Sequence, residues 1–146
     1  LFLDNFFVSY RKTKLKKGQF IRSIKIPLLE KNIFKAYKIS KRFDDDISSV
    51  CAVFNLKIVK NKIENIRIAY GGMAEIPKRA FFCEKILLKS LIDEETISKA
   101  KQALEKDFKP ITDMRASSLY RMEVAKNLLE KCCAEIKQKK LIGLYA

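Results

Sequence analysis

The fold is decided by the stretch AVFNLKIVKNKIENIRIAY, residues 52–70. In its first part, alternate positions would line one apolar face, namely Ala52, Phe54, Leu56 and Ile58. Alternation with a period of two is typical of a strand that buries one side. Asn61 lies in a short polar turn before a second run that ends at Tyr70. The stretch therefore predicts a β-hairpin with one strongly apolar face.

Two further strands are predicted upstream of this hairpin. Over residues 18–27, Phe20, Ile24 and Ile26 alternate with residues of the other face, and Pro27 would end the strand. The next strand is expected over residues 33–40. Together with the hairpin, these segments predict an antiparallel sheet of three or four strands.

Helical periodicity replaces the strand pattern after Gly71 and Gly72. A first helix is expected over residues 79–89 with Pro77 in its first turn, and Asp93 is expected to cap a second. A third helix is expected over residues 116–138. The apolar faces comprise Ile97, Ala100, Leu104 and Phe108 in the second helix, and Leu119, Met122, Ala125, Leu129, Cys132 and Ile136 in the third. Strands followed by helices predict an α+β fold with three helices on one sheet face, as a single domain over residues 1–146.

Composition excludes several classes of chemistry. The chain of 146 residues is 48% hydrophobic, yet no apolar run approaches the roughly 20 residues needed to cross a bilayer. The absence of histidine excludes imidazole zinc sites and histidine-activated nucleophiles within these residues. The four cysteines, at positions 51, 83, 132 and 133, form no C-x-x-C pair and are interpreted as buried thiols in a reducing cytoplasm. We therefore predict no catalytic residue and no metal ligand.

The formal net charge of +14 leaves three interpretations open. Clustered basic residues could bind a nucleic acid or an acidic membrane. They could instead form a docking face for an acidic partner subunit. Because the lysines are scattered over every segment, a solvated basic surface is favoured. The chain begins with Leu1 and lacks the features of a secretory signal, so we expect a fragment of a longer cytoplasmic protein.

Three short blocks stand out from this background. The first, residues 37–48, contains Lys38 and then runs from Lys41 and Arg42 into three consecutive aspartates. These charges could neutralise one another in a turn, with Asp46 or Ser48 capping the next element. Alternatively, Lys38 and the loop face a cofactor, where a fixed ammonium would stabilise negative charge.

The second and third blocks, residues 70–74 and 113–118, predict backbone turns. Gly71 and Gly72 allow positive φ and a close approach to a bulky group, but the block is too short for a dinucleotide-binding fingerprint. Asp113 is placed to cap a helix or to pair with Arg115. Upstream, Arg11 offers a planar fork for bidentate recognition and is retained as a candidate cofactor-binding residue.

Taken together, the blocks resemble the flavin-bearing subunit of xanthine dehydrogenase and related molybdenum hydroxylases, in its C-terminal part. The resemblance covers roughly residues 4–131. It is carried, in order, by Phe6-Phe7, Tyr10-Arg11-Lys12-Thr13, Ile24-Lys25-Ile26-Pro27, residues 37–48 and 70–74, Pro77-Lys78-Arg79-Ala80, Asp107-Phe108-Lys109-Pro110 and residues 113–118.

This resemblance implies an oxidoreductase component with the fold of the CO dehydrogenase flavoprotein C-terminal domain. In the family, substrate is oxidised at a molybdenum-pterin centre, electrons cross 2Fe-2S clusters, and FAD passes them to NAD or oxygen. The molybdenum and iron-sulfur centres belong to partner subunits or domains. An upstream lobe that holds the FAD pyrophosphate is absent here, so the fragment alone is not expected to be active.

Residue roles follow from the same resemblance. Lys38 matches a lysine that contacts FAD, and Ile21 matches an apolar residue lining that site. The loop that follows Lys38 matches a segment near the flavin ring, so Lys41, Arg42, Asp44 and Asp45 are candidate electrostatic tuners. A basic nucleic-acid-binding module and a noncatalytic subunit-docking lobe remain the alternatives. The sequence leaves open the substrate (xanthine, another purine or an aldehyde), the electron acceptor and the oligomeric state.

Overall fold

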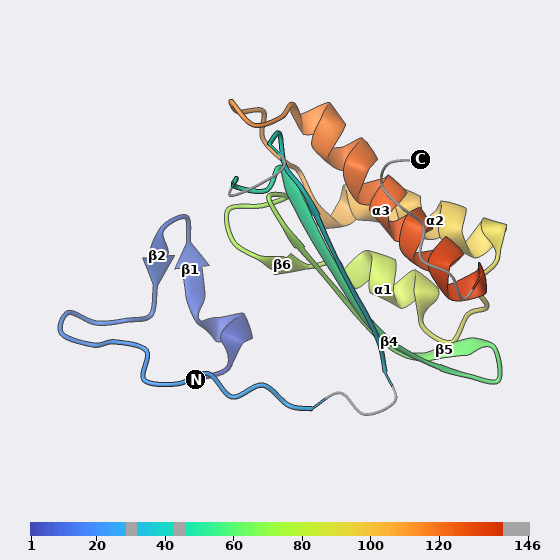
Figure 1. The fold of residues 1–146 in the computed structure, drawn as a ribbon, viewed down its shortest axis with the longest axis horizontal. Helices are drawn as coiled ribbons and strands as arrows, with labels where there is room; N and C mark the ends of the chain where they lie inside the picture. Colours follow the sequence, from blue (N-terminus) through green and yellow to red (C-terminus); the bar gives the residue numbers. More distant parts are fainter. Residues whose placement is uncertain (29–31, 43–45, 139–146) are drawn as a thin grey trace.

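The computed structural model describes residues 1–28, 32–42 and 46–138 and has an α+β architecture. Its main sheet has four antiparallel strands in the order β3 (Ile33–Ile39), β4 (Val50–Val59), β5 (Lys62–Gly71) and β6 (Lys78–Arg79). Three helices, α1 (Phe81–Leu87), α2 (Glu94–Asp107) and α3 (Ser118–Gln138), cover one face of this sheet (Figure 1). The predicted fold class is confirmed.

The β4–β5 hairpin forms as the sequence predicted. Its strands pair from Cys51 opposite Gly71 to Val59 opposite Lys62. The two residues between the strands, Lys60 and Asn61, both have positive φ, at 49° and 62°. Two consecutive residues of this kind match the right-handed twist of a hairpin, and asparagine tolerates the conformation well.

A row of aromatic rings joins the sheet to the helices. Tyr37 of β3, Phe54 of β4 and Tyr70 of β5 meet edge to face, with ring centroids 5.9 and 6.0 Å apart. Phe108, at the end of α2, continues the row 5.3 Å from Tyr70. The Tyr70 hydroxyl donates to the Ala125 carbonyl at 2.9 Å, so this buried ring has its polar atom satisfied.

Buried carboxylates also fix the helices. Glu135 of α3 accepts from Lys35 at 2.9 Å and from the Tyr37 hydroxyl at 3.0 Å. Asp107 accepts from the backbone N–H groups of Phe82 and Cys83, both at 2.9 Å, and so caps the start of α1. Each carboxylate therefore joins its own helix to another element.

The structure corrects three details of the predicted elements. Residues 18–27 form no strand, because the apolar side chains there face solvent and no neighbouring strand pairs with them. The fourth strand is instead β6, which pairs Lys78 and Arg79 with β5 immediately after Pro77, and the helix starts only at Phe81. Helix α3 starts at Ser118 rather than 116, and Leu119 is 73% exposed instead of lying on the inner stripe.

The helix predicted to follow Asp93 is confirmed at its start. Asp93 accepts a hydrogen bond from the Thr96 N–H at 2.8 Å, as an N-cap residue should. Of the predicted inner face, Ala100, Leu104 and Phe108 are buried and Ile97 packs partly buried against the core.

The N-terminal segment forms its own small sheet. A short 3-10 helix, η1 (Leu3–Asn5), leads into β1 (Phe7–Ser9) and β2 (Lys12–Thr13), which pair only with each other. None of residues 1–28 is buried. This segment lies to one side of the main sheet (Figure 1).

Candidate functional site

The second and third sequence blocks, and Ser49 directly after the first, meet around one buried side chain, the guanidinium of Arg121 in the first turn of α3. Its Nη1 donates to the carbonyls of Ser49 and Gly72, at 2.5 and 2.8 Å. Its Nη2 donates to Asp113 Oδ1 at 2.6 Å. Arg121 is only 3% exposed. One cation thus joins the start of β4, the turn after β5 and the loop before α3.

Asp113 holds the guanidinium from the loop side. Its Oδ1 also accepts from the N–H groups of Arg115 and Ala116, at 2.8 and 3.2 Å. The bond from the Arg115 N–H, helped by the guanidinium of Arg121, lowers the pKa of Asp113 to about 2. The carboxylate is therefore ionised at neutral pH. The expected pairing of Asp113 with Arg115 is present at 3.5 Å, while the shorter pair with Arg121 was not predicted.

Gly72 explains why the second block contains glycine. Its φ is +80°, the left-handed region that favours glycine. A Cβ built there would collide with the Ser49 carbonyl oxygen and lie 3.0 Å from Arg121 Nη1. At Gly72 the backbone therefore approaches the protein's own Ser49 carbonyl and the arginine that binds it.

The described ends of the β3–β4 loop bind the loop before α3 that carries Asp113. Lys41 Nζ donates to the Met114 carbonyl at 2.7 Å, and Ser49 Oγ donates to the Arg115 carbonyl at 3.3 Å. Asp46 accepts from the N–H groups of Arg42 and Ile47. The element after this loop is strand β4, so the expectation that Asp46 or Ser48 caps a helix is wrong.

Lys38 lies on the sheet face that the helices leave uncovered. On β3, Tyr37 and Ile39 pack against the core, whereas Lys38 between them is exposed. Across the sheet, Lys38 is paired with Cys51, which is paired with Gly71. Lys38 thus lies at the edge of a row whose other members, Cys51 and Gly71, have a small side chain or none.

The adjacent row on this face is also built from small residues. Ala36 is paired with Val53, and Val53 with Ala69. With Cys51 and Gly71 these residues form a low floor beside Lys38. We call Lys38 and these five residues, Ala36, Cys51, Val53, Ala69 and Gly71, the outer floor. A floor without large side chains lets a planar group approach the sheet closely.

The other predicted site residues lie elsewhere. Arg11 is in the turn between β1 and β2, at φ 58°, with its guanidinium 5.7 Å from the Tyr10 ring centroid. Ile21 is 53% exposed in the irregular segment before β3. Arg42 is exposed, while Asp44 and Asp45 fall outside the described residues. The structure brings Lys41 to the Arg121 cluster but gives no contact between Arg11 or Ile21 and Lys38.

Three of the cysteines are buried thiols, as predicted. Burial raises the pKa of Cys132 to about 12 and that of Cys133 to about 11, and it also raises the pKa of Cys83. These thiols are therefore protonated and unreactive at neutral pH. Cys51 on the outer floor is only partly buried. Within the described ranges, no group of three Cys, Asp or Glu side chains is arranged to hold a metal ion.

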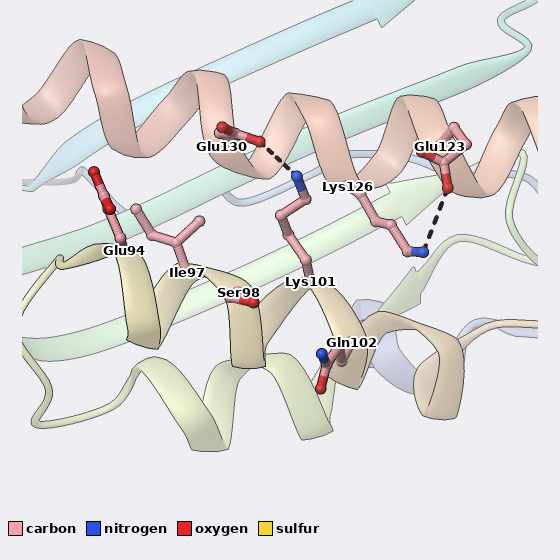
Figure 2. A pocket seen from close by; sticks show the side chains of 8 residues that line it. All are labelled: Glu94, Ile97, Ser98, Lys101, Gln102, Glu123, Lys126 and Glu130. Carbon is pink, nitrogen blue, oxygen red and sulfur yellow. Dashed lines mark hydrogen bonds and ion pairs between the residues drawn. The ribbon is translucent and has the colours of Figure 1, made fainter.

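A groove of about 540 Å³ runs between α2 and α3 (Figure 2). Charges of opposite sign line it in pairs: Lys101 contacts Glu130 at 2.5 Å, and Lys126 contacts Glu123 at 3.4 Å. The groove belongs to the helical layer, on the other side of the sheet from Lys38. None of the helices in the described part of the chain is long and apolar enough to cross a membrane.

The architecture and the outer floor define the class of protein. An antiparallel sheet with helices on one face and an open face on the other is an α+β lobe that leaves one surface for another part of a protein or a ligand. Residues 35–136 match the CO dehydrogenase flavoprotein C-terminal domain. The chain belongs to this family, which confirms the resemblance inferred from the sequence blocks.

Relatives of known identity support this assignment. The chain is 32% identical over 135 residues to the glyceraldehyde dehydrogenase medium chain of Sulfolobus acidocaldarius, a match that covers 90% of this chain and 47% of that protein. It is 37% identical over 106 residues to the xanthine dehydrogenase of Blastobotrys adeninivorans, covering 70% of this chain and 7% of that protein. The chain thus spans about half of the medium chain and a small part of the xanthine dehydrogenase.

Solved structures confirm the fold. The carbon monoxide dehydrogenase of Hydrogenophaga pseudoflava superposes with a TM-score of 0.80 at 21% identity, covering 87% of this chain and 44% of that chain. Quinoline 2-oxidoreductase from Pseudomonas putida 86 gives a TM-score of 0.80 at 22% identity, covering 94% and 48%. The nucleic-acid-binding alternative receives no support from these similarities.

Proposed function

We propose that this chain is the C-terminal lobe of the flavin-bearing subunit of a xanthine dehydrogenase-like molybdenum hydroxylase, and that the outer floor forms one wall of the FAD site. The observation that carries this proposal is the position of Lys38. In a chain of a flavoprotein family, an exposed lysine stands at the edge of a floor of small residues on the uncovered sheet face.

The residues present fit a flavin. A planar ring needs a flat surface, and the outer floor offers backbone, Gly71 and short side chains. The Lys38 ammonium can stabilise negative charge on a reduced ring or on a phosphate. When bound, FAD supplies the redox chemistry, and the role of this lobe is to position the flavin and set its electrostatics.

Further candidate contacts rest on the family resemblance. Ile21 and Arg11 are exposed in the N-terminal segment and are available to a ligand or an upstream lobe. Arg42 is available in the β3–β4 loop, and we retain Asp44 and Asp45 on the resemblance alone. Lys41 differs from them because its ammonium is bound to Met114, so its part in tuning the flavin would be indirect.

The whole protein would be a cytoplasmic electron relay. Relatives with the names glyceraldehyde dehydrogenase and xanthine dehydrogenase support an aldehyde or a purine as the substrate class. The oxidation itself would take place at a molybdenum-pterin centre in a partner subunit or domain, with 2Fe-2S clusters between that centre and FAD. NAD or oxygen would then accept the electrons. The fragment alone would not catalyse the reaction.

The test uses the complete flavin subunit, in which this chain is joined to its upstream lobe. Lys38→Ala is expected to release FAD about tenfold faster, because one hydrogen bond from a charged donor is lost. Lys57→Ala is the matched control, since Lys57 lies on the neighbouring strand β4, near the hairpin turn, and is paired with Glu64. The measurement is the flavin absorbance that remains with the protein over time after dilution.

Two outcomes contradict the proposal. A complete wild-type subunit that is purified colourless would reject FAD binding. Equal FAD release from the wild type, Lys38→Ala and Lys57→Ala would favour the alternative of a noncatalytic lobe that only docks subunits.

A further inference from the structure

We propose that Arg121 is a positioning residue for the flavin: from the helix side of the sheet it holds the strand ends that present Lys38, Cys51 and Gly71 on the outer floor. This inference rests on the proposed function. It assigns a role in flavin binding to a buried residue of α3 that does not itself reach the outer floor.

The first step of the argument is the spacing between the atoms that Arg121 binds and the outer floor. Nη1 bridges the carbonyls of Ser49 and Gly72. Gly72 directly follows Gly71, and Ser49 precedes Cys51 by two residues. The bridge therefore fixes the distance between the start of β4 and the end of β5, where the two floor residues are paired.

The second step connects Lys38 to the same bridge. The Ser49 N–H donates to the Ile39 carbonyl at 2.7 Å, and Ile39 is the residue after Lys38. Because Ser49 binds both Arg121 and Ile39, Arg121 also fixes the position of the end of β3. Lys38, Cys51 and Gly71 are therefore each within two residues of a backbone group that takes part in these hydrogen bonds.

The third step is that only a guanidinium suits the position. Arg121 donates to three acceptors from three segments, Ser49, Gly72 and Asp113, and a planar fork holds these directions rigidly. A lysine would keep the charge, but its single ammonium lacks the planar fork that spans these acceptors. The buried Ser49 carbonyl would then lose its partner or the strand ends would move apart.

A purely structural role is the competing explanation, and Asp107→Asn provides the matched control. Like Arg121, Asp107 is a buried charged residue that binds backbone atoms of another element. It caps α1, and its carboxylate binds Phe82 and Cys83 of that helix rather than β3 or β4. Its substitution should lower stability without moving the outer floor.

The experiment compares the complete flavin subunit as wild type, Arg121→Lys, Asp107→Asn and Lys38→Ala. Three quantities are measured: the rate of FAD release, iodide quenching of flavin fluorescence, and hydrogen exchange of the amides of residues 36–39 and 49–53. For Arg121→Lys we expect about tenfold faster FAD release, stronger quenching and faster exchange in both segments. For Asp107→Asn we expect a lower melting temperature with wild-type FAD release and quenching.

Thermal destabilisation of Arg121→Lys with wild-type FAD release and quenching would overturn the inference, as would equal flavin effects from Asp107→Asn. If Arg121→Lys does not fold, Asp113→Asn replaces it, because this change weakens the hold on the guanidinium by removing the charge of a partly exposed partner. The inference then requires the same three effects from Asp113→Asn, and a wild-type result overturns it. Lys38→Ala separates the two proposals: if it also leaves FAD release unchanged, the proposed function itself has failed.

Discussion

Among single residues, Gly72 shows most directly how a local conformation serves the cluster. Only glycine combines a φ of +80° with the space that Arg121 and the Ser49 carbonyl leave. Gly18 has nearly the same φ, at +83°, but a Cβ there would meet nothing within 4 Å. A comparison of Gly72 with Gly18 therefore separates the free-energy cost of the backbone conformation from the cost of the steric collision.

We predict that Gly72→Ala lowers the free energy of unfolding by about 3 kcal/mol, of which about 1 kcal/mol comes from the left-handed backbone and about 2 kcal/mol from overpacking. Gly18→Ala should cost no more than about 1 kcal/mol. Urea unfolding of the two variants, compared at unchanged m values, measures the difference. Equal losses in the two variants would show that the collision with Ser49 carries no weight.

At the level of elements, α3 is attached to the sheet by polar groups at both of its ends. Arg121 binds the strand ends near the start of the helix, and Glu135 binds Lys35 and Tyr37 of β3 near its end. Burial raises the pKa of Tyr37, so the phenol stays protonated and donates to Glu135. The helix therefore depends on directional contacts as well as on its apolar stripe.

Glu135→Gln should cost about 3 kcal/mol of unfolding free energy, because the partly buried ammonium groups of Lys35 and Lys131 would lose the buried carboxylate with which both pair. Glu130→Gln is the control on the same helix: its carboxylate is 56% exposed and pairs with Lys101 at the surface. Such a surface pair contributes less than about 1 kcal/mol. Chemical denaturation of both variants tests this order, and a larger loss for Glu130→Gln would contradict it.

On the scale of the whole molecule, no described segment covers the N-terminal residues or the open sheet face. Phe20 and Leu28 are 80% and 92% exposed, and Ile24 and Ile26 are similarly open to solvent. Apolar side chains in such a series are typical of a surface that contacts another part of a protein. The upstream lobe that we propose for the complete subunit is the expected contact, and this chain spans only 47% of the medium-chain relative.

We therefore predict that joining the upstream lobe slows hydrogen exchange of the amides in residues 18–28 by about tenfold or more. Helix α2 lies in the helical layer, so its amides should exchange at the same rate with and without that lobe. Mass spectrometry of the isolated chain and of the complete subunit measures both segments. Unchanged exchange in residues 18–28 would mean that another partner, or none, covers them.

Local patterns predicted the parts of the fold that depend on neighbouring residues. The hairpin follows from period-two alternation around a two-residue turn, and the start of α2 follows from Asp93. The segment 18–27 has the same alternation but forms no strand. Alternation reports which side chains could share a face, and a strand also needs a partner with free backbone groups.

The candidate site was predicted only in part for a similar reason. Lys38 stood out because of the family pattern, and the glycine pair because of its known backbone preference. Arg121 gave no signal, because one arginine on a helix of a lysine-rich chain looks like a surface charge. The three acceptors that bury it come from residues 49, 72 and 113, which are far apart in the sequence.

The amino-acid sequence by itself determined the α+β class, the hairpin, the cap of α2 and the membership of a flavoprotein family, because each depends on short-range patterns or ordered motifs. Only the tertiary structure decided that Ser49, Gly72 and Asp113 converge on Arg121 and that Lys38 stands beside an open floor of small residues. These features depend on strand register and helix packing, and both are set by contacts between residues that no local pattern connects.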